Sequence, residues 1–175
     1  MRCFFKVFVA LCLALTVSAC SKPAAWASDE DLAKVQYRDA GPTKLTLFTM
    51  INNRSGVGAH TSLMISASQR VIWDPAGSFY HPSIPERNDV LFGISPRVAD
   101  VYTRYHARET FHVIVQELEV SPDVAEKALQ LALARGNVGD AQCALSTSGI
   151  LSQLSGLESV SVGWYPKKLA EQFGA

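Results

Sequence analysis

The sequence predicts one α+β domain behind an N-terminal export signal. Some segments alternate apolar and polar residues as strands do, while others begin with Ser-Pro and have helical spacing. The chain has 175 residues, 48% of them hydrophobic, which suits one domain with a real core and excludes a disordered chain. The 16 basic residues balance the 16 acidic ones, which excludes a strongly basic nucleic-acid binder.

Residues 1–19 have the pattern of a secretory signal peptide. Arg2 and Lys6 make the start positive, and the run Val7–Val17 is apolar or neutral. This run is too short to span a bilayer but has the length of a signal-peptide core. No later stretch is apolar enough for a membrane helix, so we expect residues 1–19 to be removed on export.

The end of this segment, Val17-Ser18-Ala19-Cys20, resembles a bacterial lipobox. That resemblance implies lipid attachment at Cys20, which becomes the new N-terminus and anchors the protein to the membrane. Ser21 follows where Asp would mark inner-membrane retention in many Gram-negative bacteria, so the resemblance implies the outer membrane, facing the periplasm. The alternative is a simple signal peptide cut near Ala27, with Cys20 incidental.

Processing would leave one free thiol. Cys3 and Cys12 leave with the signal, Cys20 carries lipid, and Cys143 remains. A single thiol in an oxidising compartment has no intramolecular disulfide partner. Cys143 is therefore either a small buried hydrophobe or a reactive group.

The first part of the chain predicts a tether and then a hairpin. Residues 20–43 are polar and poorly periodic, apart from a short helix expected at 29–36, and the domain is expected over 44–175. Residues 44–51 alternate as a strand. Two β-like runs, 61–66 and 70–73, lie close enough to pair as a hairpin, and Asp74-Pro75-Ala76-Gly77 then predicts a turn.

The second part alternates helices with strands. A Pro-rich loop over 78–90 precedes a short strand at 90–94. Ser95-Pro96 and Ser121-Pro122 are typical helix starts, and Gly136 closes the second of these helices. The remaining expected elements are a helix at 96–106, a strand at 110–120, helices at 122–135 and 141–154, a strand at 159–162 and a helix at 166–173.

Cys143 is the candidate nucleophile. It falls three residues after Asp140, the expected cap of the helix at 141–154, so its sulfur belongs to the first turn. The backbone N–H groups and dipole of a helix start stabilise a thiolate. Full activity also needs a base, and four histidines are available: His60, His81, His106 and His112.

His60 is the best candidate base, because it stands at the mouth of a strand, beside a Gly-rich loop. Asp74 ends the partner strand of the hairpin and should lie at the same end, within hydrogen-bonding reach of His60. Asp74 is equally explained as a turn former. His81 and Tyr80 are weak candidates for substrate binding, whereas His106 and His112 are expected to be structural.

The strand opened by His60 (AHTSLMI), the paired strand ending at Asp74 and the helix beginning with Cys143 resemble the circularly permuted papain-like superfamily. Its members include permuted relatives of NlpC amidases and of lecithin:retinol acyltransferase. The resemblance covers residues 44–165, with His before Cys as in the permuted group. It implies an antiparallel sheet packed against helices, with Cys143 as nucleophile, His60 as general base and Asp74 as orienting group.

The resemblance also implies attack on an amide or ester carbonyl through an acyl-thioester. The Cys143 backbone N–H is a reasonable oxyanion donor, and nothing selects among Tyr37, Tyr80, Tyr102, Tyr105 and Tyr165 as a second. We expect no cofactor. The zinc motif His-Glu-x-x-His and close ligand spacings are lacking, so no metal is expected either.

Two functions follow as hypotheses. The first is a lipid-anchored periplasmic cysteine hydrolase (amidase or peptidase) or acyltransferase, with peptidoglycan peptides or lipid acyl groups as substrates. The second is a non-enzymatic binding or structural lipoprotein of the cell envelope. In that case Cys143 would be buried with an ordinary or raised pKa, and His60 would be remote from it. The oligomeric state is not indicated.

Overall fold

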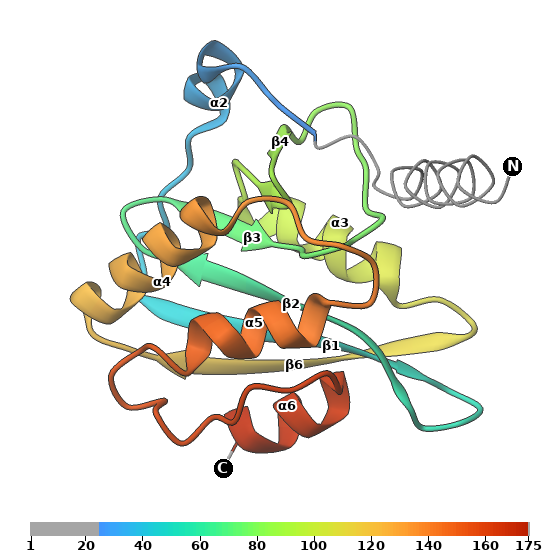
Figure 1. The fold of residues 1–175 in the computed structure, drawn as a ribbon. Helices are drawn as coiled ribbons and strands as arrows, with labels where there is room; N and C mark the ends of the chain where they lie inside the picture. Colours follow the sequence, from blue (N-terminus) through green and yellow to red (C-terminus); the bar gives the residue numbers. More distant parts are fainter. Residues whose placement is uncertain (1–24, 175) are drawn as a thin grey trace, which may run out of the picture.

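The computed structural model describes residues 25–174, and over this range the chain is a mixed α+β protein (Figure 1). The expected signal peptide over residues 1–19 and the expected lipidation site at Cys20 lie outside the described residues. Within residues 25–174, no helix is both long enough and apolar enough to cross a membrane.

An antiparallel sheet of six strands runs through the described part of the chain. The strands are β1 (Lys44–Asn52), β2 (Gly58–Ser66), β3 (Arg70–Trp73), β4 (Glu86–Arg87), β5 (Val90–Leu91) and β6 (Phe111–Glu119). Their order is β4-β5-β3-β2-β1-β6, and every neighbouring pair is antiparallel. β1 is buried from Leu45 to Ile51, because both faces of the sheet are covered.

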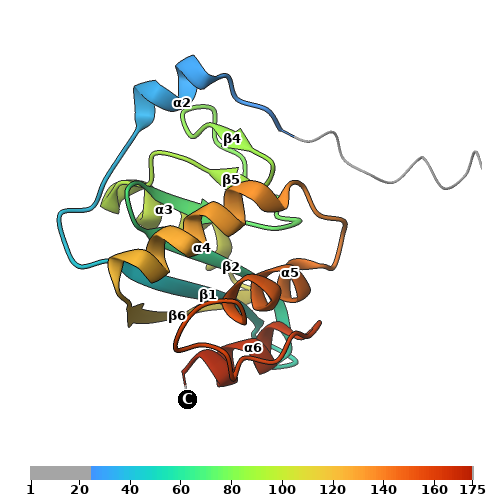
Figure 2. The same ribbon diagram turned by 60° about the vertical axis from the view of Figure 1, so that its left-hand side comes forward.

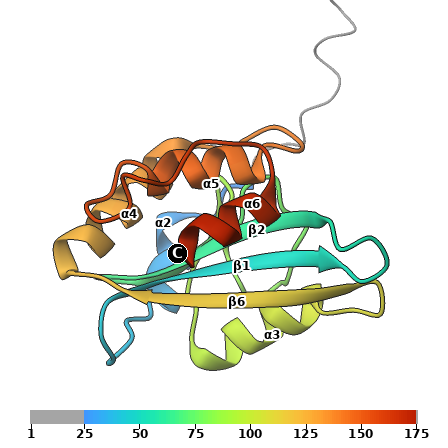
Figure 3. The ribbon, with the colours of Figure 1, turned by 90° about the horizontal axis from the view of Figure 1, so that it is seen from below.

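Helices cover the two faces unequally. The helices α4 (Pro122–Arg135), α5 (Cys143–Leu151) and α6 (Pro166–Phe173) lie on one face, and α3 (Pro96–His106) lies on the other (Figure 3). The short α2 (Asp29–Val35) lies beside the β4–β5 edge (Figure 2).

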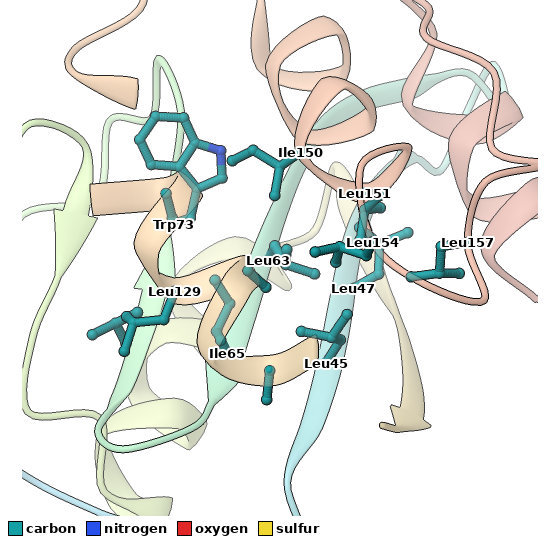
Figure 4. Close-up of a cluster of buried hydrophobic side chains, with 14 of the residues drawn as sticks. Leu45, Leu47, Leu63, Ile65, Trp73, Leu129, Ile150, Leu151, Leu154 and Leu157 are labelled. Atoms are coloured by element: carbon teal, nitrogen blue, oxygen red, sulfur yellow. The ribbon is translucent and has the colours of Figure 1, made fainter. Parts of the chain in front are cut away.

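Side-chain alternation divides the core into two clusters. Leu47 and Leu63 point toward the α4–α5 face, where they pack with Leu151 and Leu154 (Figure 4). On the other face, residues of β1, β2 and β3 pack against Tyr102 of α3; they include Phe48, Met64 and Ile72. This strict alternation sets the register, because a slip by one residue would exchange the two faces.

Most of the expected elements are confirmed. The hairpin is β2–β3, with Ser66 opposite Arg70. The hydroxyls of Ser95 and Ser121 accept the first free N–H groups of α3 and α4, and a proline follows each serine. The expected helix at 166–173 is α6.

Two expectations about the C-terminal part are wrong. Asp140 does not cap α5. Ala141 has a left-handed backbone (φ 62°), which changes the direction of the chain. The helix therefore begins at Cys143, with Gln142 as its N-cap. Residues 159–162 form no strand. This segment lies on the helical layer, away from a free sheet edge, and the Ser161 N–H bonds the Gln172 side chain instead.

The expected tether is also corrected for its described part. Arg70 is buried and binds Asp39 at 2.7 Å, while its N–H donates to the Tyr37 carbonyl. Val35 packs against the core around Gly93. Residues 25–43 therefore belong to the folded unit, because they cover one edge of the sheet.

Candidate functional site

Cys143, His60 and Asp74 meet at the point where β3 ends. The pairing of β2 with β3 stops at Leu63–Trp73, so the first part of β2 has a free edge. His60 lies on that part of β2, Asp74 follows β3 directly, and α5 brings Cys143 to the free edge. The structure thus brings together the three residues singled out from the sequence.

His60 joins the other two side chains. Its Nε2 lies 2.7 Å from Asp74 Oδ1. The Cys143 thiol interacts with the His60 side chain closely enough to shift the pKa of both groups, and Nδ1 is the ring nitrogen that Asp74 leaves available. A carboxylate on one imidazole nitrogen and a thiol on the other is the order that a nucleophile, a base and an orienting acid require.

Burial and hydrogen bonding act in opposite directions on Cys143. Burial disfavours the thiolate, but the hydrogen bond and positive charge of His60 outweigh it, and the pKa of Cys143 is lowered. The backbone N–H groups of Thr61 and Ala144 add to this effect. Thr61 can donate to the sulfur because it lies on the part of β2 that β3 does not reach.

His60 and Asp74 show the complementary shifts. Burial disfavours the charged imidazole, yet Asp74 and Cys143 outweigh it and raise the pKa of His60 to about 10. Burial would also raise the pKa of Asp74, but the bonds from His60 and Tyr102 hold it below its usual value. These directions favour a thiolate–imidazolium pair at neutral pH.

Tyr102 completes the buried end of the site. Its hydroxyl lies 2.8 Å from both Asp74 Oδ1 and Ser62 Oγ. A phenol has one hydrogen, so Tyr102 donates to the carboxylate and accepts from Ser62. Burial and the charge of Asp74 raise the pKa of Tyr102 well above its ordinary value, so it stays a donor. Sequence reasoning placed Tyr102 on α3 but could not choose it among five tyrosines.

Asp89 ties the two loops of the site together. Asp89 Oδ2 accepts the N–H of Ala76, in the turn after Asp74, and the N–H of Val138, in the loop before α5. Its carbonyl accepts the Asp74 N–H at 2.8 Å. Burial raises the pKa of Asp89 despite these two backbone bonds. No local pattern marks this residue, because its partners come from two distant loops.

A cavity of about 240 Å³ opens beside His60. Met50, Ala59 and Phe111 form its apolar side, and the turn 76–78 with His106 and Arg108 completes the lining. His106 Nδ1 lies 2.9 Å from the Tyr102 carbonyl and must donate to it, which leaves Nε2 as an acceptor. Burial lowers the pKa of His106, so this ring is neutral at pH 7.

The remaining candidates lie elsewhere. Tyr80 and His81 are exposed and do not line the cavity beside His60. His112 lies on β6, where its Nδ1 is 2.6 Å from Asn53 Oδ1, in keeping with a structural role. His106, also expected to be structural, lines the cavity instead.

His60, Asp74 and His106 also place one potential ligand atom each within 4.8 Å of one another, although no metal was expected from the sequence. The His60 ring is already engaged by both Asp74 and Cys143. A cation would have to replace those bonds, so the donor set fits a proton-transfer chain better than a metal centre.

No protein-family model, no curated protein and no solved structure matches this chain.

Proposed function

We propose that this protein is a cysteine hydrolase or acyltransferase that acts on amide or ester bonds. One observation carries the proposal: Cys143, at the start of α5, interacts with His60, whose ring hydrogen-bonds the buried Asp74 at 2.7 Å. In this chain Cys143 is the nucleophile, His60 the general base and acid, and Asp74 the orienting group.

The reaction begins from the thiolate–imidazolium pair. The Cys143 thiolate forms a C–S bond to the substrate carbonyl, and the carbonyl electrons move to oxygen, where the N–H of Cys143 can stabilise the charge. Collapse breaks the C–N or C–O bond, and His60 gives its proton to the leaving amine or alcohol. Neutral His60 then takes a proton from water or another acceptor, which attacks the acyl-thioester and releases the thiolate.

The order of the elements supports a finer assignment. The base lies on β2, the orienting acid follows β3, and the nucleophile opens a later helix that packs on the same antiparallel sheet. We assign the domain to the permuted papain-like fold on this order. In keeping with the lipobox-like Cys20, we place it as a lipoprotein of the outer membrane, with cell-wall peptides or lipid acyl groups as substrates.

The rate of Cys143 alkylation by iodoacetamide against pH tests the pair. The chain from Ser21 to Ala175 suits this experiment, because it keeps every contact described above and its only thiol is Cys143. We expect a reactive plateau well below pH 8 that His60→Ala abolishes. His112→Ala is the matched control, because His112 binds Asn53 instead of the site.

Turnover is the second readout. With an amide or ester substrate, Cys143→Ser should lose nearly all activity. A slow thiol with an ordinary pKa that is indifferent to His60 would contradict the proposal and leave the non-enzymatic envelope lipoprotein as the better explanation.

A further inference from the structure

We propose that Arg108 makes the cavity beside His60 a binding site for a carboxylate, so that the substrate carries an acid group close to the bond that is cleaved. This inference names the substrate class of the enzyme proposed above and rests on that function.

Arg108 is positioned before any ligand arrives. It lies in the turn between α3 and β6, where its N–H donates to the His106 carbonyl and its carbonyl accepts the Phe111 N–H at 2.9 Å. Its guanidinium lies over the Tyr105 ring, 4.6 Å from the ring centre. This cation–π contact holds the exposed guanidinium beside the Tyr105 ring.

Arg108 has no acidic partner in the described part of the chain. Arg70, Arg87 and Arg104 bind Asp39, Asp29 and Asp100, whereas several other described arginines, like Arg108, have no ion pair; Arg108 differs from them because it lines the cavity beside His60. No carboxylate of residues 25–174 lies within 4.0 Å of the Arg108 guanidinium. The cavity therefore has a fixed positive charge that a ligand can neutralise.

The other groups that line the cavity offer no unpaired positive charge that could bind an anion in place of Arg108. The charged His60 has two negative partners, Asp74 and the Cys143 thiolate, so these three groups together carry one net negative charge and Arg108 is the positive group of the lining that has no anionic partner. His106 is neutral and presents an acceptor. The apolar wall of Met50, Ala59 and Phe111 faces the same space. A short carbon chain that ends in a carboxylate matches this combination, because a guanidinium binds a carboxylate through two parallel hydrogen bonds.

The cavity is also close enough to the proposed active site to hold part of a substrate. His60 forms part of its lining and bonds Cys143 through the same ring. Cys143 itself is not part of the lining, so His60 is the residue that connects the nucleophile to the cavity, and the proposal places a neighbouring group of the substrate there. An N-acyl amino acid or peptide with a free carboxylate fits both requirements.

Binding can be measured without relying on catalysis. We would titrate the chain from Ser21 to Ala175 with N-acetylglycine and follow the His106 ring by NMR, with N-acetylglycinamide as the neutral twin. We expect a saturable His106 shift with the acid alone. Arg108→Gln should weaken binding at least about tenfold, as the loss of a two-bond charged contact implies. Arg108→Lys should bind at an intermediate strength.

Arg104→Gln is the matched control, because this exposed arginine of the same segment binds Asp100 and does not line the cavity. Unchanged thermal unfolding of each variant would show that it is folded. Equal shifts with acid and amide, tighter binding of inorganic phosphate, or undiminished binding by folded Arg108→Gln would each overturn the carboxylate site. Those outcomes leave the proposed function standing if Cys143 alkylation still depends on His60, so the two failures are distinguishable.

Discussion

At the scale of single residues, opposing forces on a buried group decide the chemistry of the site. Burial alone would favour a neutral Cys143 thiol and a neutral His60 ring. Against this effect, His60 lowers the pKa of Cys143, and Asp74 together with Cys143 raises the pKa of His60. The hydrogen bonds therefore outweigh the cost of desolvation.

The first prediction concerns pH and the His60–Asp74 pair. The raised pKa of His60 means that its charge stabilises the fold fully below the unfolded value of 6.5, and that this stability is lost as the pH rises toward about 10. The lowered pKa of Asp74 means that its contribution is present above 3.8 and is lost as the pH falls. The stability contributed by the pair should therefore be greatest between about pH 4 and 6.5.

Urea unfolding from pH 3 to 10 checks this prediction. Cys143→Ser would be compared with Cys143→Ser plus His60→Gln, because neither chain then has a titrating thiol. The difference in unfolding free energy should decline on both sides of the window. On the alkaline side the decline should be complete below pH 10, because Cys143, which helps to raise the pKa of His60, is replaced. A difference that grows between pH 7 and 10 would show that His60 is not charged in the fold.

The second prediction concerns Tyr102. Tyr102→Phe removes the 2.8 Å bond to Asp74 and leaves the buried Ser62 hydroxyl without this partner. We expect a loss of about 1–3 kcal/mol in unfolding free energy, together with a change in the pH dependence of Cys143 alkylation.

Tyr105→Phe is the control for Tyr102→Phe, because its hydroxyl donates to the Ser78 carbonyl at the surface. Denaturation and alkylation rates measure both variants. Equal effects of the two substitutions would remove Tyr102 from the site.

At the scale of elements, the positions of the site residues depend on the loops that connect the helices and strands. Asp89 connects the turn after β3 with the loop before α5, so it holds Asp74 and the start of the Cys143 helix relative to each other. The left-handed backbone at Ala141 then redirects the chain into α5. Both features therefore help to position Asp74 and Cys143 relative to each other.

The third prediction separates the charge of Asp89 from its role as a hydrogen-bond acceptor. Asp89→Asn keeps an oxygen for the Ala76 and Val138 N–H groups but removes a charge that burial disfavours, so its effect at pH 7 should be small. Asp89→Ala leaves both N–H groups without their acceptor and should cost about 2 kcal/mol or more. Thermal unfolding measures both. Equal losses would show that the charge, and not the acceptor, is what matters.

At the scale of the whole molecule, the segment before β1 is part of the fold. Asp39 and Tyr37 cover the buried Arg70, which also donates to the Ile94 carbonyl. An arginine in this position needs its partners, because an unpaired buried charge is strongly unfavourable.

The fourth prediction follows from that contact. Asp39→Ala should lower the unfolding free energy by about 3 kcal/mol, because it leaves Arg70 buried without its partner. Asp31→Ala is the matched control: its bond to Lys34 is exposed. Denaturant unfolding compares the two variants. Equal, small losses would indicate that residues 25–43 act only as a tether.

Local patterns predicted the strands of the central hairpin and the Ser-Pro helix starts, because caps and alternation act over a few residues. The nearness of His60 and Asp74 was predictable for the same reason: only a short hairpin separates them. The prediction that Asp140 caps α5 was wrong, because the conformation of Ala141 is set by the loops that meet there.

The sequence by itself determined which residues could do chemistry: the thiol of Cys143 at a helix start, a histidine on a strand and an acid at the end of the partner strand. The tertiary structure alone decided which other groups surround them. Tyr102 reaches Asp74 from α3, Asp89 joins two loops, and Arg108 faces the cavity beside His60. These residues come from separate elements, and only the packing of both faces of the sheet brings them within reach.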